Sequence, residues 1–187
     1  MMDTAIPLAL VIVVGPQASG KSTVAAALAA ELRRRGERAA LVELDQIAAM
    51  ALPTLPNWEA AHRIFETTVG LWARTGLTCV IAEGSGSEDE VSRLRRQAPS
   101  GAVIVVVVTT VTLEAAFARA HMDPTRGISR EWDFLNGVYE KWADELVRIG
   151  PDVVIDTSRL TVEQGVRRTI SRIQSARFGP DSLGPNS

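Results

Sequence analysis

A glycine-rich segment directly after the first apolar run is the feature that most constrains this chain. The run, residues 8–14, is largely β-branched, and a helical pattern begins near residue 21. The segment between them fits G-x-x-x-x-G-K-[ST], and it lies in the strand–loop–helix context that this motif requires. It consists of Gly15, Pro16, Gln17, Ala18, Ser19, Gly20, Lys21, Ser22 and Thr23. The chain is therefore restricted to α/β folds that contain this phosphate-binding loop, residues 15–23.

The residue types in the phosphate-binding loop predict how it binds its ligand. Gly15 and Gly20 permit backbone angles that turn successive N–H groups toward phosphate oxygens. The helix that begins near Lys21 adds the positive end of its dipole. Lys21 is expected to reach the β- and γ-phosphates, and the hydroxyl of Ser22 is expected to ligate Mg²⁺. The alternative is a glycine-rich turn that carries a lysine by chance, but pattern and context agree, so we expect binding of ATP with Mg²⁺.

Four further apolar runs alternate with helix-period stretches. They cover residues 39–44, 78–82, 102–108 and 152–155. Because the runs are nearly continuous, they are typical of strands buried on both faces of a parallel sheet. We predict an α/β fold with a doubly wound, five-stranded parallel sheet, flanking helices and a short lid. The predicted domain spans residues 1–174 with the lid near 119–133, and residues 175–187 are predicted to be a flexible tail.

Composition excludes several classes of protein. The 187 residues suit one domain, and 20 Lys and Arg against 22 Asp and Glu give a net charge of −2, so nucleic acid is not an expected partner. The single cysteine, Cys79, excludes an intrachain disulfide. The apolar run at residues 5–14 is interrupted by Pro7 and is too short for a membrane span, and the first residues lack the basic region of a secretory signal. We expect a cytoplasmic protein without membrane contact, and the sequence does not predict its oligomeric state.

The order of elements, the N-terminal phosphate-binding loop and an arginine-bearing segment near residues 119–130 resemble the small P-loop kinases. This group includes shikimate kinase, gluconate kinase, nucleoside monophosphate kinases and chloramphenicol phosphotransferase. Residues 44–50, with Pro53 shortly after, are most similar to the chloramphenicol phosphotransferase region that carries a catalytic aspartate. The resemblance implies an ATP-dependent kinase that phosphorylates a hydroxyl of a small molecule, either an antibiotic or a metabolite.

Two acidic residues at the ends of predicted strands are candidates for binding or deprotonating the acceptor hydroxyl. Asp45 follows the second strand, where ligands of open α/β sheets bind, and could orient the hydroxyl and receive its proton. Its alternative role is a helix N-cap. Glu83 ends the third strand and could hold an Mg²⁺-bound water or the acceptor, or it could be a surface acid. Which of the two is the base stays open. Shikimate kinase has a glycine-rich turn here, whereas this chain begins the turn with an acid and lacks the following arginine, so shikimate is not the expected substrate.

Three arginines and a threonine are candidates for contact with ATP. The resemblance implies a lid that closes over ATP and places Arg119 near the adenine or α-phosphate, with Arg126 and Arg130 nearer the γ-phosphate. The alternative is a loop in which these arginines are only solvated. Thr157 follows the last strand, in a turn that passes the adenine in similar kinases. It could equally be the N-cap of the last helix.

The segment between Asp45 and Thr78 is expected to form the acceptor side, with Trp58 and His62 as substrate candidates. It holds only two arginines, and its apolar side chains, three of which (Trp58, Phe65 and Trp72) recur at heptad spacing, are expected to form the wall of the acceptor pocket. This composition favours a neutral acceptor with a partly apolar body. The apolar side chains are Met50, Leu52, Leu55, Trp58, Phe65 and Trp72. One alternative is a nucleotide or nucleic-acid-end kinase, which would need more arginines here. Another is an ATP-hydrolysing switch or toxin-like module.

Overall fold

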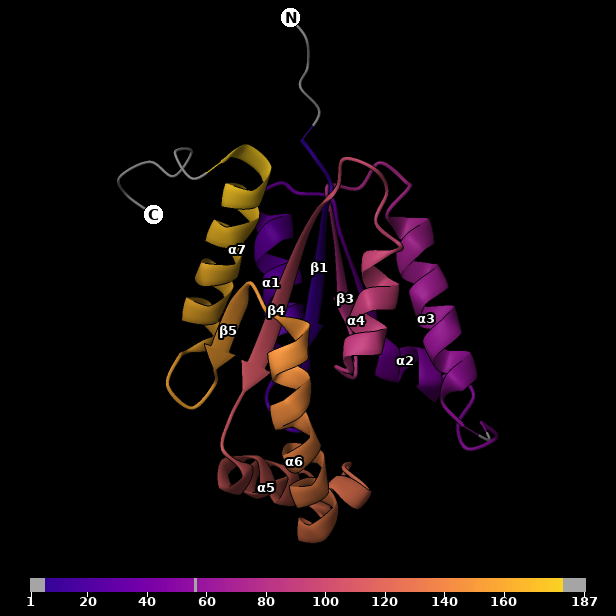
Figure 1. Cartoon of the computed structure of the whole chain (residues 1–187), viewed down its shortest axis with the longest axis vertical. Helices are drawn as coiled ribbons and strands as arrows, with labels where there is room; N and C mark the ends of the chain where they lie inside the picture. The colour runs from indigo at the N-terminus through magenta and orange to yellow at the C-terminus, as the bar shows by residue number, and fades with distance from the viewer. Residues whose placement is uncertain (1–5, 56, 180–187) are drawn as a thin grey trace, which may run out of the picture.

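The computed structural model describes residues 6–55 and 57–179, and its centre is one parallel β-sheet (Figure 1). The five strands pair in the order β2-β3-β1-β4-β5, and every pairing is parallel. They are β1 (Ala9–Val14), β2 (Ala39–Glu43), β3 (Cys79–Glu83), β4 (Val103–Thr110) and β5 (Val153–Asp156). The predicted doubly wound, five-stranded sheet is confirmed.

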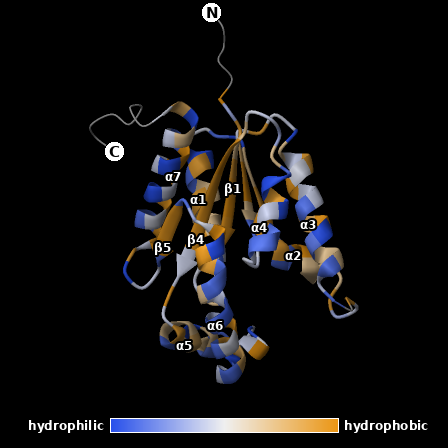
Figure 2. Cartoon of the chain, in the orientation of Figure 1, coloured by the Kyte–Doolittle hydropathy of each residue, from blue (hydrophilic) through white to orange (hydrophobic). Residues whose placement is uncertain are grey.

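Helices cover both faces of the sheet. They are α1 (Lys21–Arg34), α2 (Leu44–Ala49), α3 (Glu59–Trp72), α4 (Glu88–Arg95), α5 (Leu113–Met122), α6 (Trp132–Ile149) and α7 (Val162–Phe178), with a short 3₁₀ helix η1 (Ile128–Arg130). Helices α1 and α7 pack on one face, and α2, α3, α4 and the second half of α6 pack on the other. Figure 2 shows the apolar strands between these partly hydrophilic helices.

The two-sided cover explains the continuous apolar pattern of the strands. In β1, Leu10 and Ile12 belong to the core under α3 and α4, whereas Val11 and Val13 belong to the core under α1 and α7. All four side chains are fully buried. Because successive strand residues point to opposite faces, a strand between two helical layers needs apolar residues at every position.

Helix α5, η1 and the first turns of α6 project beyond the carboxyl end of the sheet (Figure 1). The predicted lid lies in this part of the chain. It has its own small apolar cluster, in which Ala116, Ala120 and Leu135 pack against Ala18 of the phosphate-binding loop. The projecting helices therefore contact the phosphate-binding loop itself, beyond the carboxyl ends of the strands.

The C-terminal helix is longer than the sequence predicted. Residues 175–178 were expected to begin a tail, but α7 continues to Phe178. The cause is tertiary contact, because Ala176 packs against the core under α1 and α7, and Arg177 donates hydrogen bonds of 2.7 and 3.0 Å to the carboxylate of Glu37. The rest of the predicted tail, residues 180–187, lies outside the described residues. In residues 6–55 and 57–179, no helix is both long and apolar enough to cross a membrane.

Candidate active site

The phosphate-binding loop folds tightly between β1 and α1. Ala18 and Gly20 have left-handed backbone angles, with φ of 60° and 95°. A side chain on Gly15 would collide with the carbonyl oxygen of Thr109 and with the hydroxyl of Ser19. The buried hydroxyls of Ser19 and Thr109 lie 2.7 Å apart and connect the loop to β4. This conformation has the concave backbone that phosphate oxygens require, at the N-terminus of a 14-residue helix.

Lys21, Ser22 and Glu83 form a polar group beside the loop. The Nζ of Lys21 lies 4.0 Å from Oε1 of Glu83, and the hydroxyl of Ser22 donates a hydrogen bond of 3.4 Å to the same oxygen. Glu83 comes into place because it pairs in register with Val13, one residue before the end of β1. It is almost fully buried, so it is not the surface acid that the sequence left possible.

Burial shifts the pKa values of both Glu83 and Lys21. It raises the pKa of Glu83 to about 7, with Asp45 and Glu43 adding to the rise while Lys21 opposes it. Burial also lowers the pKa of Lys21, against the attraction of Glu83 and Asp45. The two side chains therefore depend on each other for their charged forms.

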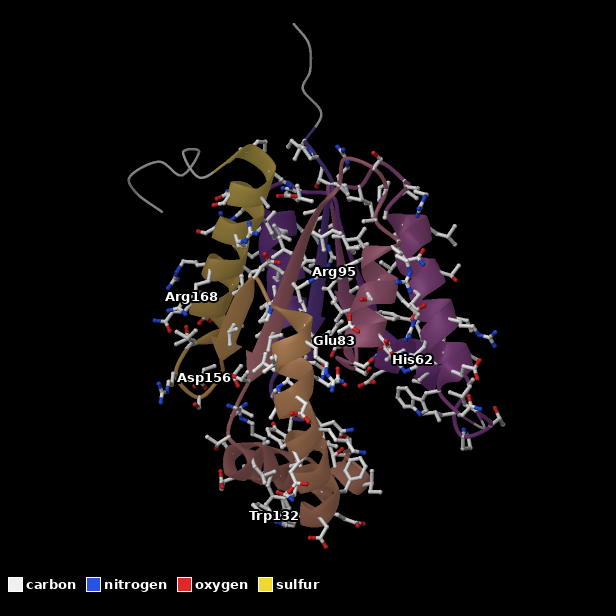
Figure 3. All side chains as sticks on the ribbon, viewed as in Figure 1. His62, Glu83, Arg95, Trp132, Asp156 and Arg168 are labelled. Carbon is white, nitrogen blue, oxygen red and sulfur yellow. The ribbon has the colours of Figure 1, made fainter. Side chains whose placement is uncertain are left out.

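A cavity of about 770 Å³, the main cavity, opens at the carboxyl end of the sheet. The phosphate-binding loop forms one wall, and Asp45, Trp58 and His62 line it from α2 and the start of α3. Figure 3 labels His62 on α3 and Glu83 at the end of β3, near the middle of the molecule. The remaining lining residues come from the start of α2, the turn after β3, the segment 123–129 and α6: Leu44, Gly84, Ser85, Gly86, Ser87, Asp123, Thr125, Arg126, Ser129, Val138, Lys141, Trp142 and Glu145.

A side cavity of about 240 Å³ adjoins the main cavity, with Ala18, Gly20, Thr23 and Arg126 lining both. Its other walls include Arg119 and Thr157. The Thr157 hydroxyl donates to the carbonyl of Ser19 at 2.8 Å, and Arg119 donates to the hydroxyl and carbonyl of Thr157 at 2.8 and 3.0 Å. Thr157 is not the N-cap of α7, because Thr161 forms that cap in a capping box with Gln164.

The structure separates the predicted catalytic residues into two groups. Lys21, Asp45 and Arg126 line the main cavity. Asp45 lies in the first turn of α2, where Glu43 occupies the N-cap position, so the capping alternative for Asp45 is wrong. Arg126 contacts Asp123 at 3.2 Å. Arg130, in contrast, ends η1 with an exposed side chain and lines neither of these cavities.

Sequence reasoning missed the contribution of α6 and a buried acid in α4. Lys141, Trp142 and Glu145 line the main cavity from α6, and none of them was among the residues that the sequence singled out for the site. Glu90 is fully buried, and its carboxylate accepts hydrogen bonds from the backbone N–H and hydroxyl of Ser85 at 2.8 and 2.9 Å. The spacing Ser87-x-x-Glu90 marks a helix start and was an available signal.

Glu90 also holds His62. The Nδ1 of His62 lies 2.8 Å from Oε2 of Glu90, close enough for an ion pair although its N–H is not aligned for a regular hydrogen bond. This contact raises the pKa of His62. Burial favours a raised pKa for Glu90, but the contacts with His62 and Ser85 outweigh it and lower that pKa. The pair thus favours imidazolium beside carboxylate.

A phosphate-binding loop between β1 and α1 of a five-stranded parallel sheet defines a P-loop protein with the fold of the small kinases. A family model described as an AAA domain matches residues 10–122, more than half of the chain, and the chain belongs to this family. A comparison with curated proteins gives no significant match.

Solved structures with this fold include three kinases. Shikimate kinase from Acinetobacter baumannii in complex with shikimate is 20% identical, with 92% of this chain and 97% of that chain covered and a TM-score of 0.64. A gluconokinase from Sinorhizobium meliloti 1021 is 17% identical, with 92% and 94% covered and a TM-score of 0.64. The Mycobacterium tuberculosis APS kinase in complex with AMPPNP and APS is 17% identical, with 90% and 99% covered and a TM-score of 0.64. At sequence identities of 17–20%, the similarity to these structures establishes the fold of this chain and nothing further.

Proposed function

We propose that this protein is an ATP-dependent kinase that transfers the γ-phosphoryl group to a hydroxyl of a small molecule. One observation carries the proposal: the phosphate-binding loop, with Lys21, shares the main cavity with Asp45 and with polar side chains from α3 and α6. A cavity of about 770 Å³ has room for the phosphates of a nucleotide and for a second small molecule. The kinases among the similar structures support this reading.

The nucleotide would lie across both cavities. Its phosphates fit the concave backbone of the phosphate-binding loop, where the N–H groups and Lys21 face the main cavity. Its base fits the side cavity, between Arg119, Thr157 and the start of α7. Arg126 lines both cavities and is therefore suited to contact the phosphate chain between them.

Magnesium fits the oxygen donors beside the loop. The described residues hold no cluster of three or more His, Cys, Asp or Glu side chains arranged for a metal ion. Mg²⁺, however, is usually bound through phosphates with one or two protein oxygens, and the hydroxyl of Ser22 together with nearby carboxylates suits that arrangement. The bound ion would offset negative charge on the phosphates.

The transfer step assigns distinct work to the two acids. The acceptor oxygen forms a bond to the γ-phosphorus while the bond to the β–γ bridging oxygen breaks, and ADP leaves with that electron pair. The hydroxyl proton goes to a carboxylate oxygen of Asp45, which is exposed to the cavity. Glu83 is already in contact with Lys21 and Ser22, so we assign it to positioning those two groups. Lys21 and Arg126 stabilise charge on the transferring group.

A phosphoryl-transfer assay against a library of compounds tests the identity of the acceptor. Purified protein is incubated with ATP, Mg²⁺ and a library of hydroxylated metabolites and antibiotics. The library includes chloramphenicol, because residues 44–50 resemble a segment of chloramphenicol phosphotransferase. Mass spectrometry then identifies the products. The expected result is a phosphorylated product that requires Lys21. ATP hydrolysis with no phosphorylated compound would instead favour the ATP-hydrolysing switch.

A further inference from the structure

The indole N–H of Trp142, the ammonium of Lys141 and the Nε2 of His62 have no hydrogen-bond acceptor in the part of the chain that the structure describes, whereas the Nδ1 of His62 faces Glu90. The side chain of Trp142 is only 9% exposed, and its Nε1 is buried without a hydrogen-bond partner there. Lys141 precedes it on α6, and His62 belongs to α3. All three residues line the main cavity. Buried indole N–H groups are nearly always paired, so a ligand is expected to complete this site.

Packing fixes the direction of the Trp142 indole. Gly86 lies so close to it that a Cβ there would stand 2.7 Å from Cζ3 of the ring. The ring also belongs to the core beneath α3, α4 and α6. An N–H held by such packing loses little conformational freedom when it binds an acceptor, which strengthens recognition.

His62 is oriented by its own buried partner. Its Nδ1 faces Glu90, and Glu90 is held in turn by Ser85. The other charged groups that face His62 are Glu66 and Arg93, which pair with each other at 2.6 Å. Glu90 therefore determines the charge of the ring, and the second ring nitrogen remains available to a ligand.

Lys141 is exposed on the wall of the main cavity, and no carboxylate of the described residues forms an ion pair with it. The acid one turn further along α6, Glu145, is already engaged, because its Oε2 accepts a hydrogen bond of 2.7 Å from the backbone N–H of Glu88. Its other oxygen faces Arg148 at 4.0 Å. A negative group on the ligand would complement Lys141.

We propose that His62, Lys141 and Trp142 bind a carboxylate of the acceptor, so that the substrate is a hydroxylated organic acid. This inference rests on the proposed function and names its substrate class. A singly charged carboxylate fits better than a phosphate ester, because the only arginine that lines the main cavity among the described residues is Arg126, which we assign to the nucleotide, and because Glu145 and Asp45 also line it.

The same geometry argues against the neutral, partly apolar acceptor that the sequence suggested. Of the apolar side chains expected to form its wall, Met50 and Leu52 are 80% and 52% exposed and do not line the main cavity. Phe65 is buried in the core, and Trp72 lies away from the cavity. Only Trp58 of that set lines the cavity among the described residues.

The test measures binding without nucleotide, on matched pairs of ligands. Gluconate, glycerate and quinate are each compared with their carboxamides by calorimetry, up to about 10 mM. The proteins are the wild type, Trp142→Phe, which keeps the ring and removes the N–H, and Lys141→Met. Trp132→Phe and Arg63→Met are controls, since Trp132 and Arg63 are exposed and line neither cavity.

We expect at least one acid to bind about 10-fold or more tightly than its amide, with this preference lost in Trp142→Phe and Lys141→Met and kept in both controls. Equal binding of acid and amide, no binding of any acid, or an unchanged preference in both cavity variants would overturn the proposal. Phosphoryl transfer is assayed separately. If the protein binds an acid more tightly than its amide but transfers no phosphoryl group, only the kinase function is contradicted. If it phosphorylates neutral compounds and no acid, only the carboxylate site is contradicted.

Discussion

The Nζ of Lys21 lies 4.0 Å from Oε1 of Glu83, so the cation that the phosphate-binding loop offers to a nucleotide already has a carboxylate neighbour. The attraction of Glu83 opposes the desolvation that lowers the pKa of Lys21. Phosphate oxygens that enter the loop meet a cation held in position before they arrive.

Replacing Lys21 with Ala is expected to reduce kcat/KM by about 100-fold or more and to weaken ATP binding, because charge on the β- and γ-phosphates loses its partner. The fold should persist, since Lys21 belongs to no apolar core cluster. Steady-state kinetics, nucleotide titration and circular dichroism check this. A folded variant with wild-type transfer would contradict the nucleotide site.

Asp45→Asn should lower kcat by about 100-fold while ATP binding changes little, because the amide cannot receive the hydroxyl proton. Glu83→Gln provides the comparison. If Glu83 positions Lys21 and Ser22, its loss should weaken ATP binding together with kcat. The reverse pattern, with Asp45→Asn active and Glu83→Gln inactive but binding ATP normally, would move the base to Glu83.

Arg126→Ala is expected to reduce kcat by about 100-fold, and more strongly than it weakens ATP binding, since Arg126 lines both cavities and meets charge that grows during transfer. Arg130→Ala is the matched control from the same segment, because Arg130 is exposed and outside both cavities. An equal loss of kcat in both variants would contradict the assignment of the nucleotide to these two cavities.

Gly86→Ala should destabilise the protein by about 1–3 kcal/mol, because the new Cβ meets Trp142 and the backbone there is left-handed, with φ of 102°. Gly137→Ala in α6 is the control: no atom lies within 4 Å of its new Cβ, and Ala favours a helix, so stability should rise by about 0.5–1 kcal/mol. Urea denaturation measures both. Equal stability of the two variants would contradict the close packing at Gly86.

The contact between His62 and Glu90 predicts a pH dependence of stability. Because the pKa of His62 is raised above its usual 6.5, its contribution is complete below about pH 6.5 and is lost as pH rises through the folded-state pKa. Because the pKa of Glu90 is lowered, its contribution is present above the usual 4.5 and is lost in more acidic solution. The stability that His62→Gln removes should therefore be larger at pH 6 than at pH 8.

The control for this experiment is His121→Gln, since His121 stacks on Phe117 and no carboxylate of the described residues pairs with it. We expect the effect on the free energy of unfolding to differ more between pH 6 and pH 8 for His62→Gln than for this control, because His62 has a carboxylate neighbour in Glu90. A His62→Gln effect that is equal at pH 6 and pH 8 would mean that Glu90 does not control the charge of His62.

The sheet and the nucleotide side could be predicted because their signals are local. A strand buried on both faces leaves a continuous apolar run, and the strands β1 to β5 begin and end within two residues of the predicted ones. The phosphate-binding loop is likewise one uninterrupted segment. Neither prediction required knowledge of which distant residues meet.

The acceptor side could not be predicted because it is assembled by tertiary packing. Glu90 and His62 come from different helices, and Trp142 reaches them from α6. Trp72 was grouped with Trp58 by its heptad spacing, but 14 residues of α-helix extend about 21 Å, which takes Trp72 away from the cavity. The resemblance to the small P-loop kinases placed Arg130 with Arg126 near the γ-phosphate, although Arg130 ends η1 with an exposed side chain.

Helix α6 touches both sides of the site, and this has a thermodynamic consequence. The hydroxyl of Tyr139 donates a hydrogen bond of 3.0 Å to the carbonyl of Gln17 in the phosphate-binding loop, and Trp142 lies three residues further along the same helix. If α6 shifts when one substrate binds, the contacts that α6 makes with the other substrate shift as well. The two binding equilibria are then linked, and such linkage is reciprocal: the factor by which ATP changes the acceptor's Kd is the factor by which the acceptor changes the Kd of ATP.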